Sequence, residues 1–249
     1  TQYLFLTTGE ANISEQNAKG YFHLFTSAVY FFPIFGALIS DIFFGKYKTI
    51  IALSLIYCLG HLVLAIDPSI LGLSLGLIFI SIGSGGIKPC VSAHLGDQFS
   101  KTNSSFISRA YSWFYIAINL GAFTSTLITP YLLKHYSPTI AFAVPGVFMV
   151  LATLFFWAGR YKFIHIKPEG KKTLLELKKS NNIKIILKLL TIFIFVSFFW
   201  CLFDQTGSSW ILQAEKMDRE IFGIEILSGQ ILSANPIMIL IFTPLFFKY

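Results

Sequence analysis

Charged residues are scarce in this sequence. Asp, Glu, Lys and Arg together make up 12% of its 249 residues, whereas a soluble domain carries roughly 25%. Hydrophobic residues account for 55% and include 27 phenylalanines, and the mean hydropathy is +0.68. A soluble fold of this size has too thin a polar shell to cover so much apolar surface. A bilayer removes the difficulty, because lipid replaces water around the outward-facing side chains.

The signatures of several other protein classes are missing as well. The three cysteines, Cys58, Cys90 and Cys201, lie far apart inside apolar stretches, which argues against a disulfide framework or a zinc site. The histidines are scattered, and no HExxH, GxSxG or Walker motif occurs. We therefore expect neither an enzyme nor a metal protein. The net charge of +7 does not indicate a nucleic-acid partner, because the cations lie in the gaps between apolar runs.

Long apolar runs dominate the chain. A membrane-spanning helix needs about 20 such residues, and these runs are too long and too evenly apolar for the strands of a barrel. We predict an all-α, polytopic membrane protein with a partial helical bundle. Residues 1–7 are interpreted as the end of an earlier helix, which indicates a fragment. The seven predicted spans cover residues 21–43, 49–66, 70–93, 106–133, 139–158, 185–212 and 230–247.

The predicted loops alternate in charge. The first gap contains Lys46 and Lys48, the third is bordered by Lys101 and Arg109, and residues 159–184 are strongly basic. The gaps between them are nearly free of cations, so the positive-inside rule places the basic loops in the cytoplasm. Residues 159–184 are predicted to link an N-terminal bundle, 1–158, to the start of a second bundle, 185–249. A solvated topogenic loop is a compatible interpretation, and Leu174, Leu175 and Leu177 in it are predicted to form one face of a surface helix.

A few polar side chains lie inside the predicted spans, where a central charge costs roughly 2.5–3.5 kcal/mol on insertion scales. Lys88 precedes Pro89 in a glycine-rich stretch, and it either serves a site within the membrane or snorkels to the cytoplasmic surface. Asp204 lies between Trp200 and Trp210. That polar stretch either lines an aqueous cavity or belongs to an aromatic belt at the outer interface. The apolar residues that follow favour the cavity.

Two pairs of polar side chains share helical faces. Tyr115 and Asn119 are four residues apart, although Asn119 could serve only to hydrogen-bond between helices. His23 and Tyr30 are seven residues apart on the first span, where a lone histidine is more often a packing residue than a proton carrier. Asp41 ends the same span beside a basic turn, a position typical of a lock between helix ends.

Three motifs, taken together, resemble the proton-dependent oligopeptide transporter family of the major facilitator superfamily. The first, at residues 36–50, reads GALISDIFFGKYKTI and is similar to the family's signature after its second helix. The second reads GGIKPCVSA at 85–93 and continues as GDQF at 96–99, and the third reads YIAINLG at 115–121. The stretch 199–214 adds a fourth similarity. Their order and spacing also fit, and the resemblance covers nearly the whole chain.

The resemblance implies that the seven spans are family helices two to eight. Members have twelve core helices in two six-helix halves around a central cavity. They drive the uptake of di- and tripeptides with an inward proton gradient and need no cofactor. The implied location is the plasma (inner) membrane. The implied gating and structural positions are Gly36, Asp41, Gly45, Lys46, Pro89 and Arg109.

The resemblance also implies roles for the polar residues within the spans. Lys88 matches a helix-four lysine that serves proton and peptide-carboxylate chemistry, and His23 falls at the spacing of a helix-two histidine tied to proton coupling in animal-type members. The implied substrate-binding residues are Tyr30, Lys88, Tyr115, Asn119 and Trp200, and the implied proton-coupling residues are His23, Lys88 and Asp204.

The sequence departs from the family pattern at its ends. The helix-one Glu-x-x-Glu-Arg element and helices nine to twelve are absent, and the missing carboxylates would normally partner the lysine. The expected partners are therefore the peptide, protons, the bilayer and the missing helices, and we expect no transport by the 249 residues alone. A membrane sensor or a degenerate transporter remnant is the alternative outside the transporter class. Nitrate or amino-acid derivatives are alternative substrates within it.

Overall fold

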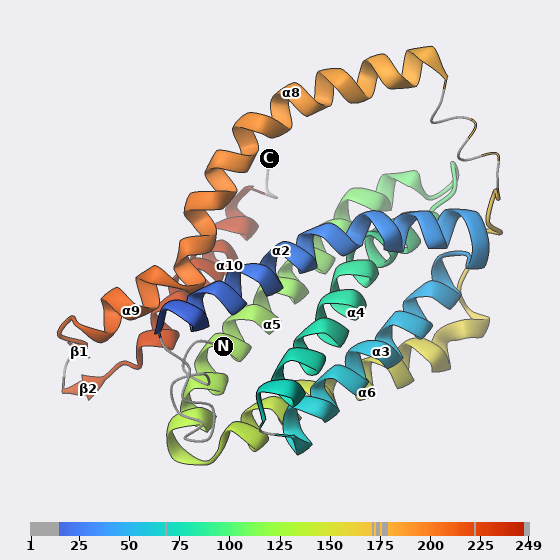
Figure 1. Cartoon of the computed structure of the whole chain (residues 1–249). Helices are drawn as coiled ribbons and strands as arrows, with labels where there is room; N and C mark the ends of the chain where they lie inside the picture. Colours follow the sequence, from blue (N-terminus) through green and yellow to red (C-terminus); the bar gives the residue numbers. More distant parts are fainter. Residues whose placement is uncertain are drawn as a thin grey trace.

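The computed structural model describes residues 15–246 apart from 68, 171, 173, 174, 176–178 and 222, and this part of the chain is almost entirely helical (Figure 1). Six helical stretches in it are long and apolar enough to cross a membrane. They correspond to the first six predicted spans, so the all-α membrane fold is confirmed. The spanning stretches are Asn17–Phe44, Lys46–Ile66, Ile70–Asp97, Ser104–His135, Pro138–Tyr161 and Asn182–Glu215.

The first helix group, residues 15–161, contains five long helices. Two side-chain caps and one glycine mark where its helices begin. Ser69 and Ser137 each accept a hydrogen bond from a backbone amide in the first turn of the following helix. Gly45 has a φ of 77°, a left-handed conformation that glycine adopts freely, where the chain turns back. The elements are α2 (Glu15–Ile39), η1 (Ser40–Phe44), α3 (Lys46–Ile66), α4 (Ile70–Asp97), η2 (Ser104–Phe106), α5 (Ile107–His135), α6 (Pro138–Ala158) and η3 (Gly159–Tyr161).

Small residues bring the helices of this group close together. A Cβ on Gly36 of α2 would collide with the backbone of Gly86 in α4, and one on Gly60 of α3 would meet the carbonyl of Gly76 in α4 at 2.9 Å. Membrane helices gain contact area in this way, because lipid offers no hydrophobic drive between them. The buried apolar cluster on α2, α3 and α4 consists of Ala18, Leu64, Leu73, Leu77 and Ile80.

The second helix group, residues 180–246, begins with a long helix whose side chains from 183 to 202 are all exposed. Figure 1 shows the first half of this helix standing away from the others. Its far end joins η5 and α10, which pack against α5. The elements are α8 (Ser180–Phe203), η4 (Asp204–Gly207), α9 (Ser209–Glu215), β1 (Glu220–Ile221), β2 (Ile224–Glu225), η5 (Ser228–Ser233) and α10 (Ala234–Phe246).

The predicted sixth span is interrupted rather than continuous. Residues 204–207 form a 3-10 turn, and Ser208 departs from helical geometry with φ −133° and ψ −92°. The side-chain oxygen of Gln205 accepts hydrogen bonds from the hydroxyls of Ser208 and Ser209. These side-chain bonds link the residues on the two sides of the break. Gly207 lies against Phe22 of α2, so the break also brings the second group onto the first.

Three other predictions differ from the structure or fall outside it. The seventh predicted span appears as α10, of which 13 residues are helical and residue 247 lies outside the described part. A short antiparallel hairpin, β1–β2, lies where no element was predicted. Residues 1–7, Leu174 and Leu177 lie outside the described residues, so the earlier helix and the surface-helix face stay predictions, while Leu175 is helical.

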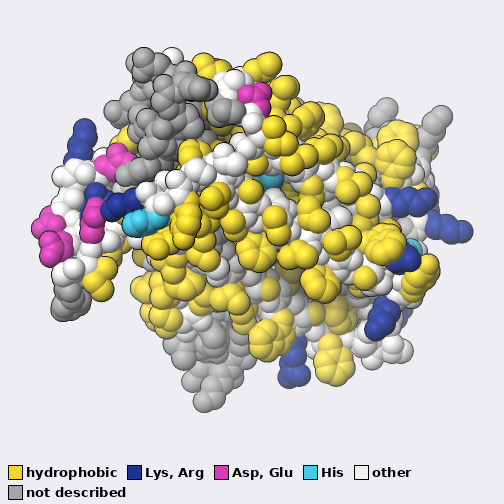
Figure 2. Space-filling view, turned by 90° about the horizontal axis from the view of Figure 1, so that it is seen from below, with side chains coloured by type: hydrophobic (Ala, Val, Ile, Leu, Met, Phe, Trp, Pro, Cys, Tyr) yellow, Lys and Arg dark blue, Asp and Glu magenta, His cyan; other side chains and the backbone are white. Residues whose placement is uncertain are grey.

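The outer surface fits a bilayer. Figure 2 shows hydrophobic side chains over the broad middle of the visible face, with several Lys and Arg side chains at the end that carries the segment after α6. Most of the visible acidic side chains lie at the opposite end, near the hairpin. Some Lys and Arg side chains are also visible at the hairpin end, beside the acidic ones.

The hairpin is tied to the end of α5 by an exposed ion pair. The Lys134 ammonium donates a hydrogen bond of 2.9 Å to Glu225, and this bond holds the pKa of the Glu225 carboxyl below its usual value. Because the pKa is lower in the folded state, the ion pair stabilises the folded protein at pH values above the ordinary pKa of Glu. This stabilisation is lost as the pH falls through the pKa of the folded state. We expect an NMR titration to place the Glu225 midpoint below about 4.3. Lys134→Ala should raise it, and an unchanged midpoint would contradict the contact.

Candidate functional site

Three polar or aromatic side chains from three helices meet within the membrane-spanning region. The Lys88 ammonium of α4 lies 5.6 Å from the centre of the Tyr30 ring of α2. The Tyr30 ring lies 6.2 Å from that of Trp200 in α8, at an angle of 51°. All three side chains are exposed in this chain. We call this set the Lys88 cluster, and it joins the first helix group to the second.

The position of Lys88 bears on the two interpretations of its charge. It lies about 13 Å along α4 from the end of that helix at Asp97. Its ammonium lies over the face of Tyr30, where the ring quadrupole attracts a cation. The ammonium therefore contacts a ring of the neighbouring helix α2 and does not extend to the membrane surface. This geometry favours a site within the membrane over snorkelling.

Asp204 supplies the nearby negative charge. It lies half-buried in η4, and its carboxylate is close enough to Lys88 and to His23 for Coulombic attraction. Among the described residues, however, Lys88 forms no direct ion pair with a carboxylate.

Asn119 faces a separate cavity. Its side chain is buried, and its amide nitrogen donates a 2.9 Å hydrogen bond to the backbone oxygen of Tyr115. It lines a cavity of about 380 Å³ together with Phe203, Thr206 and residues of α9 and α10. The Phe203 ring also contacts Trp200, at 5.4 Å between centres. The Phe203 ring thus belongs to the lining of the Asn119 cavity and also contacts the Lys88 cluster.

The other predicted side chains are not all part of the cluster. The Tyr115 side chain is 47% exposed, and none of the ring contacts found in the described part of the chain joins it to Tyr30 or Trp200. The His23 ring packs edge-on against Phe22 at 5.5 Å. Because Asp204 is also within electrostatic reach of His23, the packing and proton-carrying interpretations both stay open.

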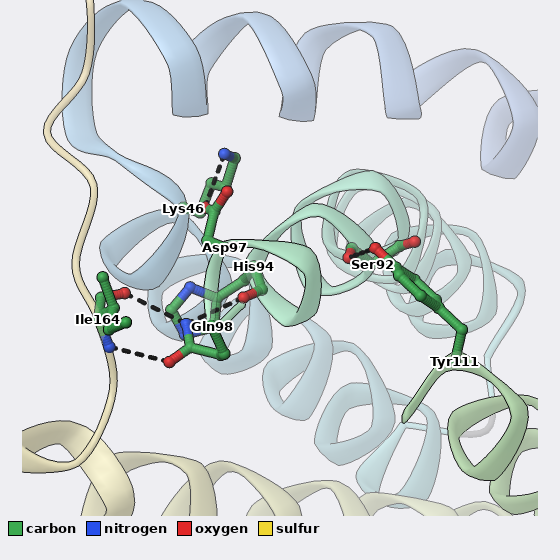
Figure 3. Close-up of polar contacts among 7 residues, drawn as sticks. All are labelled: Lys46, Ser92, His94, Asp97, Gln98, Tyr111 and Ile164. Atoms are coloured by element: carbon green, nitrogen blue, oxygen red, sulfur yellow. Dashed lines mark hydrogen bonds and ion pairs between the residues drawn. The ribbon is translucent and has the colours of Figure 1, made fainter. Parts of the chain in front are cut away.

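The predicted lock involves an acid that sequence reasoning did not select. Lys46, at the start of α3, forms a 2.7 Å ion pair with Asp97 at the end of α4 (Figure 3). The Asp41 backbone oxygen instead accepts a 2.9 Å hydrogen bond from the amide of Glu169. Asp97 belongs to the GDQF part of the second motif, and that was the available signal. Its pairing with a residue 51 positions away could not be read from the sequence.

The segment after α6 is hydrogen-bonded to the end of α4 beside the Lys46–Asp97 ion pair. The Gln98 side chain accepts a 2.9 Å hydrogen bond from the Ile164 amide and donates one of 3.2 Å to the Ile164 carbonyl (Figure 3). On the other side of α4, the Tyr111 hydroxyl donates to the Ser92 carbonyl at 2.9 Å. Residues of α3, of α5 and of the segment after α6 thereby hold the end of α4.

The remaining gating and structural positions differ in their surroundings. Gly36 makes the close approach to α4 described above. Pro89 lies inside α4, which continues past it to Asp97. Arg109 is exposed near the start of α5, and no ion pair of its side chain is found within the described ranges.

The Lys46–Asp97 pair should contribute to stability cooperatively. Both side chains are mostly covered, at 21% and 15% exposed. Removing one partner leaves a partly buried charge unpaired, which is costlier than removing both. In a double-mutant cycle of Lys46→Ala and Asp97→Ala, we expect a coupling of about 1–3 kcal/mol in the unfolding free energy. Additive effects of the two substitutions, measured by thermal unfolding in detergent, would contradict this assignment.

The arrangement is that of a multi-pass integral membrane protein with a polar site between two groups of helices, as in secondary transporters. The POT family profile matches residues 47–178 and 172–249, and the chain belongs to that family. It is 36% identical over 96% of its length to Peptide transporter family 1 of Drosophila melanogaster. It is 36% identical over 94% of its length to Solute carrier family 15 member 2 of Homo sapiens. The resemblance to the oligopeptide transporter family is thereby confirmed.

Solved structures give the same result. The crystal structure of the POT family transporter PepTSo aligns with 98% of this chain at a TM-score of 0.86 and 33% identity. An auto inhibited POT family peptide transporter aligns with 97% of it at 0.84 and 28% identity. The chain spans 38% of the Drosophila relative and 63% of the PepTSo chain. The relatives carry the names of transporters, in agreement with the expectation that the protein is not an enzyme.

Proposed function

We propose that the whole protein to which this chain belongs takes up di- and tripeptides, driven by a proton gradient, by alternating access. The observation that carries the proposal is the Lys88 cluster, in which an ammonium and two aromatic rings meet from α2, α4 and α8. The peptide-transporter names of the relatives support the substrate class. The plasma (inner) membrane is the proposed location.

The proposed coupling follows from the charge of Lys88. Its ammonium can hold a peptide carboxylate or a carboxylate of the protein, but hardly both. Among the described residues, Asp204 is an acid within electrostatic reach of Lys88. Protonating a protein carboxylate that competes for Lys88 would leave the ammonium to bind the substrate. Because protonation and peptide binding then favour each other, the proton gradient drives uptake.

The proposed substrate contacts are those that peptides share. The hydroxyls of Tyr30 and Tyr115 and the amide of Asn119 can hydrogen-bond a peptide backbone without reading its side chains. The Trp200 ring, 43% exposed beside Tyr30, offers an apolar wall. Such a site suits a broad range of short peptides.

The two helix groups are the proposed moving parts. Residues 1–158 and 185–249 are assigned to two bundles, with 159–184 as the cytoplasmic linker, and rocking of one bundle against the other would open the site to each side in turn. The Tyr30–Trp200 contact crosses this boundary, so we expect it to change between the two states.

The proposal is tested by reconstituting the full-length protein in vesicles with an alkaline interior. Labelled dialanine should accumulate above its external concentration, and a protonophore should collapse that accumulation. Protein-free vesicles are the control. Binding of dialanine without any flux would instead indicate a sensor, and uptake indifferent to the pH gradient would contradict proton coupling.

A further inference from the structure

A second pocket lies at the basic end of the helices, away from the Lys88 cluster. It has a volume of about 290 Å³ and lies between the turn that joins η1 to α3 and the segment after α6. Its own lining contains no carboxylate side chain, whereas Asp41 and Glu169 line the adjoining cavity, which shares Lys46 and Lys167 with it. The polar side chains that line it are Lys46, Tyr47, Lys48, His94, His165 and Lys167.

Two buried polar groups in this pocket lack a partner. His94 is 5% exposed, and its Nε2 forms no hydrogen bond with any described residue. The Tyr47 hydroxyl is likewise buried and unbonded within the described part. The Tyr47 ring lies 6.4 Å from that of His94 and 4.7 Å from that of His165. Buried polar groups are almost always bonded to protein, water or a ligand, so these two groups are candidates to bind a ligand that enters the pocket.

The charges around the pocket indicate the sign of that partner. Lys48 and Lys167 are exposed, and no acidic side chain in the described ranges pairs with either. Lys46 is shared with Asp97 and therefore contributes less. Hydroxyl and imidazole N–H groups can both donate to an oxyanion, and lysines supply the counter-charge. An anion with several acceptor oxygens would satisfy both unbonded groups and pair with the two lysines.

We infer that this pocket binds a phosphate group, held by Lys48 and Lys167 and by the Tyr47 hydroxyl and His94 Nε2. Its place at the basic end of the spans is where juxtamembrane cations meet anionic headgroups. Phe44, 60% exposed in the same lining, offers apolar surface to an acyl chain. An anionic phospholipid headgroup is the favoured source, and soluble phosphate has the same chemistry. The bound group would join the turn before α3 to the segment after α6, whatever the protein transports.

Lipid binding to the full-length protein in detergent tests this inference, measured by native mass spectrometry with phosphatidylglycerol as the probe. We expect one retained lipid, with an affinity reduced tenfold or more in the Lys48→Gln/Lys167→Gln variant. The control, Lys101→Gln/Lys162→Gln, removes the same charge from exposed positions at the same end and should leave the affinity unchanged. Equal losses of lipid affinity in both variants would overturn the inference, because they would show that the lipid responds to the surface charge of this end and not to the pocket.

Tyr47→Phe provides the second arm. It keeps the ring that stacks on Phe156 at 5.2 Å and removes the unbonded hydroxyl, so the lipid-free protein should be as stable as the wild type or more so. Its affinity for phosphatidylglycerol should nevertheless fall about threefold to tenfold, and an unchanged affinity would overturn the site. Competition by inorganic phosphate with the same dependence on Tyr47 would identify soluble phosphate as the ligand. Its failure to compete would identify the lipid headgroup.

Discussion

Lys88→Ala in the full-length protein should abolish the accumulation of a labelled dipeptide against its gradient. The ammonium lies over the Tyr30 ring, and no carboxylate in the described part of the chain pairs with it directly. We propose that it binds the peptide carboxylate. A charge-assisted hydrogen bond is worth about 1.5–3 kcal/mol, which corresponds to roughly a tenfold to hundredfold loss of peptide affinity. Coupling should be lost as well, because no cation remains for which substrate and protein carboxylates compete.

The matched control is Lys101→Ala, which removes an exposed lysine from the loop between α4 and α5. Uptake should be measured in vesicles with an alkaline interior, and unfolding in detergent should confirm that both variants fold. Lys101→Ala should accumulate dipeptide as the wild type does. Retained proton-driven accumulation by Lys88→Ala would refute the assigned role.

Gly36→Ala should be among the most destabilising single-methyl additions in the first helix group. The new Cβ would collide with the backbone oxygen, Cα and carbonyl carbon of Gly86, and a backbone cannot rotate aside as a side chain does. Overpacking of this kind costs about 1–3 kcal/mol, and here the shift would separate α2 from α4. That separation would also move Tyr30 away from Lys88, so uptake should fall with stability.

Gly121→Ala is the control for Gly36→Ala. Both glycines lie inside long helices, but a Cβ on Gly121 would meet no atom within 4 Å. There the substitution should be neutral or stabilising by up to about 1 kcal/mol, from helix propensity alone. Unfolding in detergent measures both. If Gly36→Ala proves as stable as Gly121→Ala, the close crossing of α2 and α4 is wrong.

The membrane-spanning helices were predictable because the length of an apolar run is a strong signal. The break at 204–208 was not, since one turn of short polar residues can stay helical or leave the helix, and the choice depends on Gln205 bonding to two serines and on Phe22 packing at Gly207. The hairpin has two-residue strands, too short for any alternation of polar and apolar residues to mark them.

The candidate site was predictable only as a set of unusual residues. The cost of charge in lipid singles out Lys88 and Asp204, but it does not say which side chains face one another. The helices are apolar on nearly every side, so periodicity does not reveal the face of α2 that carries Tyr30 toward Lys88 and Trp200. The Lys46–Asp97 pair and the orphaned Tyr47 and His94 also depend on how separate helix ends meet, and that is a tertiary property.

The most direct measurement is a structure of the full-length protein with a bound dipeptide. We expect the peptide carboxylate to lie within hydrogen-bond distance of Lys88 Nζ, with the peptide backbone beside Tyr30 and Trp200. A peptide bound elsewhere, with Lys88 still resting on Tyr30 and touching no part of the substrate, would contradict it.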